Sequence, residues 1–136
     1  MVEDLFGGLG DLIVVDTESD LHAIGIASAM MSTHYELQNR MIAWLEARGM
    51  APEAAAAYVR SMFEGLAAVA IETGRAGEAV VPAHHETKGG LNEYGRLHLT
   101  GIGWFDEIAR ALDGIAAHAE KLTAPKPAPK PDAKPA

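Results

Sequence analysis

Residues 19–48 read SDLHAIGIASAMMSTHYELQNRMIAWLEAR, and this stretch decides the fold. Ser19 and Asp20 are favoured N-caps, and Gly49 follows the last periodic residue, so the stretch predicts one long helix. One stripe steps by three and four and is mostly apolar: Leu21, Ile24, Ser28, Met31, Tyr35, Gln38, Ile42 and Leu45. A second stripe contains Ile26, Met30, Leu37, Met41 and Trp44. A helix that is apolar on two sides lies either at the centre of a bundle or between its own core and a partner chain.

Three further segments predict helices, which makes the fold all-α. Residues 52–73 begin with a proline in the first turn, end before Gly74, and carry one apolar stripe. That stripe consists of Ala55, Val59, Met62, Phe63, Leu66, Val69 and Ala70. Residues 91–99 predict a short helix and residues 104–122 a final one, whereas residues 75–90 predict irregular chain.

The first eighteen residues do not fit an all-helical pattern. A short helical turn at 4–6, three glycines and the β-branched run at 12–15 predict helix, loop and strand. No other segment of the sequence predicts a strand, and a lone buried strand leaves its backbone polar groups unpaired. We therefore interpret residues 1–18 as the remnant of a domain whose remaining strands lie on another chain or on a missing segment.

The last segment, residues 123–136, reads TAPKPAPKPDAKPA and holds five of the seven prolines. Proline fixes φ and removes a hydrogen-bond donor, so this composition predicts an extended, disordered tail. The predicted organisation is a remnant at 1–18, a helical domain at 19–122 and the tail at 123–136.

Composition and charge exclude several classes of function. The 136 residues are 49% apolar with a formal net charge of −8, which makes nucleic acid and acidic lipid unsuited partners. There is no cysteine, so disulfides, thiolate zinc sites and cysteine nucleophiles are excluded. An acidic start is untypical of a secretory signal, and no run of about 18 uncharged apolar residues spans a bilayer. A cytoplasmic protein is expected.

The loop Gly89-Gly90 before a helix is the best local candidate for a binding site. Two glycines let backbone N–H groups approach an anion, and the helix N-terminus adds partial positive charge. Asn92 or Glu93 could cap the helix, while Thr87 and Lys88 supply a hydroxyl and a cation. A small carboxylate-bearing molecule suits this pattern, and an ordinary structural turn is the alternative interpretation.

Histidines supply the other candidates. The run His84-His85-Glu86 suggests a metal, but adjacent side chains in an extended loop point apart and no third ligand has suitable spacing, so we expect no metal site. His85 could instead line a substrate pocket as a proton or hydrogen-bond donor. His34 lies on the long helix and is a further candidate for substrate binding. The alternative interpretation is a partly buried histidine with a structural role. No residue is assigned as catalytic.

Two segments resemble one known family. Residues 3–10, EDLFGGLG, with the strand at 12–15, are similar to the end of the nucleotide-binding domain of pyrroline-5-carboxylate reductases. The helices that follow, with the segment TKGGLNE at 87–93, resemble that family's helical dimerisation domain. The resemblance implies a homodimer with interlocked helical domains, NAD(P)H on a Rossmann domain, and reduction of a cyclic imine to proline. It also aligns Ser28 to His34 with the family's substrate-proximal motif, Ser-Gly-Ser-Gly-Pro-Ala-Tyr, and only the serine matches.

No Gly-x-Gly-x-x-Gly occurs anywhere in the sequence, so this chain alone is not expected to hold NAD(P)H. The leading hypothesis is a dimerisation and substrate-binding module of such a reductase, with the cofactor on a missing or separate nucleotide-binding domain. The alternative is a non-catalytic helical homodimer that acts as a scaffold or a small-molecule binding module. A third hypothesis, metal-dependent hydrolysis through residues 84–86, has the least support.

Overall fold

The computed structural model describes residues 13–123, and the elements in this range are all helical. The α-helices are α2 (Glu18–Ser28), α3 (Met31–Glu46), α4 (Pro52–Arg75), α5 (Leu91–Gly101) and α6 (Trp104–Thr123), and a short 3₁₀ helix, η1 (Pro82–His85), lies in the α4–α5 connection. The all-α prediction is confirmed.

The long helix predicted over 19–48 has an interruption at Ala29 and Met30, which separates α2 from α3. The hydroxyl of Ser28 donates to the carbonyl of Ile24 at 2.8 Å, a back-bond that bends helices. The next two N–H groups tighten to i−3 bonds, Ala29 to Ile26 and Met30 to Ala27. Both residues keep right-handed helical dihedral angles. The interruption is therefore a tightened turn in a nearly continuous helical path.

Glycines close the helices where the backbone turns left-handed. Gly49 has φ 90° after α3, as predicted, and the N–H of Met50 reaches back to Leu45. The end of α4 lies beyond the predicted one. Gly74 remains inside the helix, and Gly77, at φ 76°, makes the left-handed turn.

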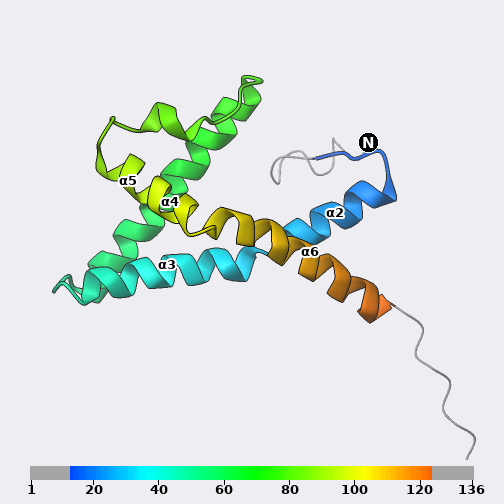
Figure 1. The fold of residues 1–136 in the computed structure, drawn as a ribbon, viewed down its shortest axis with the longest axis horizontal. Helices are drawn as coiled ribbons and strands as arrows, with labels where there is room; N and C mark the ends of the chain where they lie inside the picture. Colours follow the sequence, from blue (N-terminus) through cyan, green and yellow to red (C-terminus); the bar gives the residue numbers. More distant parts are fainter. Residues whose placement is uncertain (1–12, 124–136) are drawn as a thin grey trace, which may run out of the picture.

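The helices form two arms rather than one compact bundle (Figure 1). In the first arm α3 packs against α4, and in the second α2 packs against α6. The connection after α4 folds back through η1 to α5, and α5 packs against the start of the chain's last helix, α6. The α2–α6 pair thus extends away from α4 (Figure 1).

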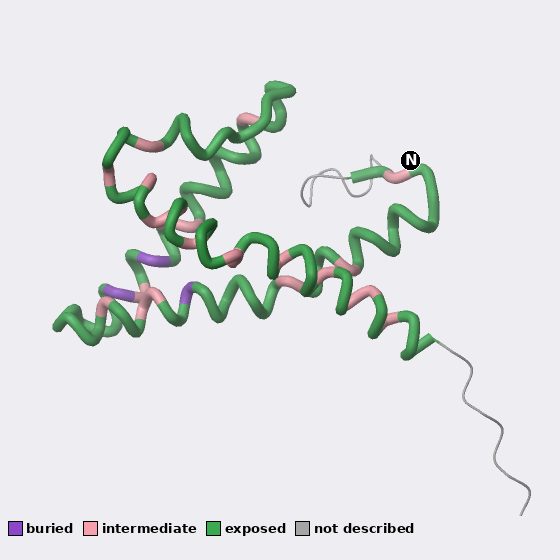
Figure 2. Tube along the Cα trace, viewed as in Figure 1, coloured by how far each residue is buried: buried purple, intermediate pink, exposed green. Residues whose placement is uncertain are grey.

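Very little of the described chain is buried (Figure 2). The buried apolar residues are Ala55 and Val59, both fully inaccessible, and they lie where α4 meets α3. Gln38 of α3, 9% exposed, lies at the same seam. Large apolar side chains elsewhere are open to solvent, among them Leu21, Met31, Tyr35, Trp44, Leu66 and Leu97. A folded chain of this length normally hides most such side chains in a core of its own.

The predicted strand is not formed. Residues 13–15 belong to no strand, and Ile13 and Val14 are 75% and 72% exposed. The physical reason is that the described range contains no second strand with which these residues could pair. Leu12, the predicted helical turn at 4–6 and the tail at 124–136 lie outside the described residues, while Thr123, predicted to begin the tail, is the last residue of α6.

One described helix, α4, is long and apolar enough to cross a membrane by length and composition alone. The sequence pattern predicted no membrane-spanning segment. Arg60 and Glu64 lie near the middle of the helix, where a charge in a bilayer is costly. The first half of α4 also carries the two fully buried residues of the α3–α4 seam. These features favour a helix that packs on protein.

Candidate functional site

The Gly-Gly loop makes a tight turn that requires both of its glycines. Gly89 has φ 75°, a conformation that other residues rarely adopt. The N–H of Gly90 donates to the carbonyl of Thr87 at 2.7 Å. A side chain at Gly90 would place its Cβ 2.7 Å from that same carbonyl oxygen. The two glycines thus bring Thr87 directly beside the start of α5.

The carboxylate of Glu93 occupies the turn at the N-terminus of α5. Its Oε2 accepts from the backbone N–H of Gly89 at 2.6 Å, an arrangement close to a capping box. An N-terminal helix end favours negative charge, and here the chain supplies that charge itself. A carboxylate ligand at this position must therefore share the turn with Glu93 or displace it.

A hollow of about 260 Å³ opens beside the turn and brings together several of the predicted substrate-binding residues. It is lined by His85, Thr87, Gly90, Leu91 and Asn92. The amide of Asn92 donates to the carbonyl of His85 at 3.1 Å and so fixes the end of η1 to α5. Lys88 is exposed in the same turn.

The other two predicted residues, Ser28 of α2 and His34 of α3, lie apart from this hollow. The Ser28 hydroxyl is bonded to the backbone of its own helix. His34 lines a different cleft, of about 450 Å³, between α3 and α4. The Gln38 amide hydrogen-bonds its Nε2 at 2.6 Å, and the Phe63 ring meets it edge-on at 5.1 Å. In one protomer the predicted residues therefore lie in three places: the turn and hollow at the start of α5, the end of α2 at Ser28, and the α3–α4 cleft at His34.

Sequence reasoning missed the ion pair between Glu86 and Arg96. The guanidinium donates twice, from Nε to Oε1 at 2.5 Å and from Nη2 to Oε2 at 2.9 Å. The Glu86 side chain is 8% exposed and that of Arg96 33%. The pair ties the η1 loop to α5 and lies at the edge of a largely apolar hollow of about 340 Å³ next to α4. The two residues are ten apart, so no helical spacing marks them in the sequence.

The Glu86–Arg96 pair predicts a loss of stability in acid. The hydrogen bond from Arg96 holds the pKa of Glu86 below its ordinary value of 4.5, although burial opposes the shift. The stabilisation is therefore fully present above pH 4.5 and is lost as the pH falls through the lowered pKa. We expect Glu86→Gln to lower the melting temperature near neutrality and the difference from wild type to vanish in acid. Thermal unfolding followed by circular dichroism from about pH 7 to about pH 2 measures this difference in melting temperature.

The control for this prediction is Glu36→Gln. Glu36 pairs with Arg40 on the surface of α3, and both side chains are largely exposed. Exposed pairs contribute little, so the control should change the melting temperature much less than Glu86→Gln does. Equal effects of the two substitutions at neutral pH would contradict the role of the Glu86 pair.

The described residues contain neither a candidate metal cluster nor the strand–loop–helix unit of a Rossmann dinucleotide site. No group of three His, Asp or Glu side chains among residues 13–123 could hold a metal ion, and Glu86 of the His84-His85-Glu86 run is engaged by Arg96. The described range also contains no strand followed by a glycine-rich turn and a helix, the arrangement that binds a dinucleotide pyrophosphate. We therefore derive no reaction step through NAD(P)H on this chain.

Comparison of the chain with protein families, with curated proteins and with solved structures finds no match.

Proposed function

We propose that this chain is the dimerisation and substrate-binding module of an NAD(P)-dependent reductase that is similar to pyrroline-5-carboxylate reductases. The observation that carries the proposal is the exposure of the apolar side chains. The helices of the protomer leave their apolar faces open and bury almost no core. Such a protomer gains its stability from a partner. The resemblance of residues 3–10 and 87–93 supplies the class of enzyme.

The exposed area supports a homodimer. The chain exposes 11701 Å², whereas a compact protein of 14.4 kDa exposes about 6,800 Å². Even if the undescribed residues contributed the full area of an extended chain, about 3,600 Å², the described part would exceed its compact value by roughly 2,000 Å². Two protomers that hide this excess bury about 4,000 Å², within the range of obligate dimers.

The remaining parts of the proposal concern ligands and location. The hollow beside Gly90 and Asn92 would take a small carboxylate-bearing molecule, close to the charge of Lys88. NAD(P)H would be held by a missing domain or a separate nucleotide-binding chain. The module has a formal net charge of −8, so it is poorly suited to bind nucleic acid or acidic lipid. We place the module in the cytoplasm.

The alternative function is a non-catalytic helical homodimer that acts as a scaffold or a small-molecule binding module. The observation that favours it is Glu93, whose carboxylate already occupies the turn where a substrate carboxylate would bind. Calorimetric titration with L-proline separates the substrate-binding module from the scaffold. Saturable binding to the purified chain supports the substrate-binding module, and no binding at millimolar ligand favours the scaffold.

Sedimentation velocity tests the dimer directly. Met31 and Tyr35 are 63% and 61% exposed on α3, so a dimer interface over this face should hide them. We expect the wild-type chain to sediment as a dimer and Tyr35→Asp to dissociate or unfold it, because an unpaired carboxylate is costly to bury. A folded Tyr35→Asp variant that is still dimeric would count against this face, and a monomeric wild type would overturn the proposal.

A further inference from the structure

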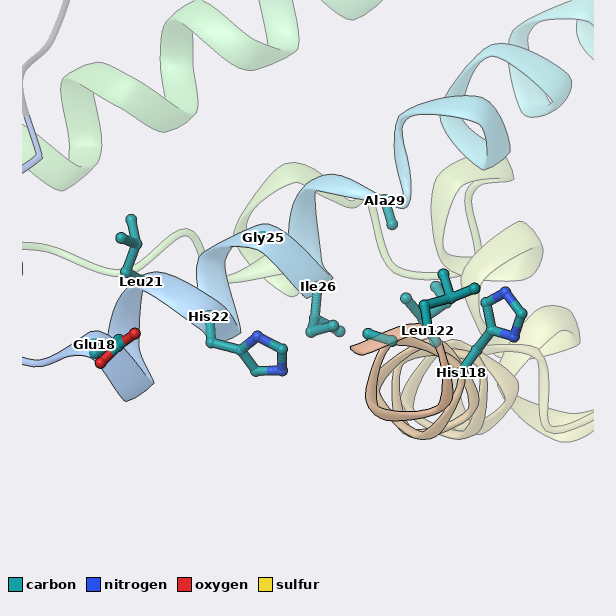
Figure 3. Close-up of a pocket in the computed structure, with 10 residues that line it drawn as sticks. Glu18, Leu21, His22, Gly25, Ile26, Ala29, His118 and Leu122 are labelled. Atoms are coloured by element: carbon teal, nitrogen blue, oxygen red, sulfur yellow. The ribbon is translucent and has the colours of Figure 1, made fainter. Parts of the chain in front are cut away.

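The seam between α2 and α6 opens into an apolar groove of about 550 Å³ (Figure 3). The lining contains large apolar side chains from both helices together with the small residues Gly25, Ala29 and Ala119. Apart from Glu18 at one end and two histidines, the lining is apolar. The lining residues that matter here are Leu21, Gly25, Ile26, Ile115, Ala119 and Leu122.

The shape of this groove suits a helix. Gly25 has no heavy atom within 4 Å of the position that a Cβ would take, and alanines 29 and 119 add little bulk. Small residues between larger ones allow another helix to approach closely, as ridges pack into grooves. Ile26 lies on the side of α2 that faces α6, with Leu122 across from it (Figure 3).

The groove is open in the part of the chain that the structure describes. Leu21 is 62% exposed and Leu122 73% exposed, one from each helix. The principal contact of α2 is with α6, and two helices that touch along one seam cannot cover both of their apolar faces. Within residues 13–123, the groove is therefore lined only by residues of α2, its C-cap Ala29 and α6.

A second copy of the chain is the occupant that the observations favour. The excess exposed area of roughly 2,000 Å² per protomer matches what an obligate dimer hides from each subunit. The chain's own described elements are amphipathic helices with open apolar faces, which is the chemistry that this groove accepts. An acidic chain with a formal net charge of −8 is poorly suited to an anionic membrane surface as the covering partner.

We propose that the groove between α2 and α6 receives an apolar helix of a second copy of this chain. The inference rests on the proposed dimeric function and assigns this arm to the interface. By the two-fold symmetry of a homodimer, each protomer would offer its groove and insert its helix. The apolar lining of the α2–α6 groove then becomes protein interior only in the dimer.

Two matched substitutions on α6 test this placement. Ala119 lines the groove, whereas Ala117 is exposed and lies two residues away, about 200° around the same helix. Ala119→Glu should weaken dimerisation at least 30-fold in sedimentation equilibrium, because the carboxylate would be buried without a partner. Ala117→Glu makes the same chemical change at the same end of the helix and should alter the dissociation constant less than threefold.

A milder pair keeps the test valid if Ala119→Glu does not fold. The chain has no cysteine, so Ala119→Cys and Ala117→Cys each carry one thiol. In the dimer, the thiol at 119 should react with a maleimide at least 50-fold more slowly than the thiol at 117. Equal reactivity in a dimeric protein would overturn the placement.

The outcomes separate the two proposals. A wild-type dimer that is weakened at 119 and not at 117 supports the groove as the interface. A wild-type dimer that both glutamate variants leave intact overturns the groove and leaves the dimeric function standing. A wild-type chain that is monomeric at every concentration overturns the proposed function and this inference with it.

Discussion

Replacing Val59 with aspartate is expected to unfold the chain. Val59 is fully inaccessible at the α3–α4 seam, where the only other buried apolar residue of the described chain is Ala55. A carboxylate at this position would lie in an apolar contact without a partner, and a charge buried in this way costs several kcal/mol. With so small a core, that cost exceeds what the α3–α4 arm contributes. Helix content by far-ultraviolet circular dichroism should fall sharply at 25 °C.

A milder change and a control define the size of the Val59 effect. Val59→Ala removes two methyl groups and should lower the free energy of unfolding by about 2–3 kcal/mol in urea titrations at fixed protein concentration. Ser61→Asp adds the same carboxylate two residues along α4 at an exposed position and should change the free energy by less than about 0.5 kcal/mol. A folded, cooperative Val59→Asp protein would show that the seam does not stabilise the chain.

The second large effect is expected from Ala55→Leu. Ala55 is fully inaccessible on α4, the helix that packs against α3. Leucine adds three carbons to a contact without spare volume, so the helices must separate or the side chain must adopt a strained rotamer. The expected loss in the free energy of unfolding is about 1–3 kcal/mol.

Ala54→Leu is the matched control for Ala55→Leu, since it makes the same substitution at the neighbouring, exposed position of α4. Leucine and alanine are both good helix formers, so Ala54→Leu should leave stability within about 0.5 kcal/mol of wild type. If the two variants are equally stable, the α3–α4 contact is looser than the buried positions indicate.

Much of the fold follows from local sequence patterns. Periodicity and caps predicted every α-helix of the described range, and Gly49 closes α3 in the predicted left-handed conformation. The observed helix boundaries differ from the predicted ones where another local interaction changes the course of the helix. Ser28 bonds back to Ile24 and interrupts the long helix, and α4 continues past Gly74 to the left-handed Gly77. Glycine is tolerated inside a helix at modest cost, so its presence alone does not fix the end.

The candidate site was predictable only in part. The sequence could predict that Thr87 to Glu93 lie close together, because residues adjacent in sequence at a loop before a helix are also close in space. The pairing of Glu86 with Arg96 could not, since the loop 76–90 must first fold back onto α5. Likewise, Glu93 is one of several possible caps in the sequence, and the structure shows that its carboxylate reaches Gly89.

The sequence by itself determined that this chain forms helices and where most of them begin and end, because hydrogen bonds and caps within a helix join residues close in sequence. It also determined the apolar stripe of α4. Only the tertiary structure decided how much of that stripe is covered: Ala55 and Val59 are buried, whereas Leu66 and Val69 are 59% and 47% exposed. Whether an apolar residue is buried depends on which helices pack together, and the apolar stripe of one helix does not identify the helix that will cover it.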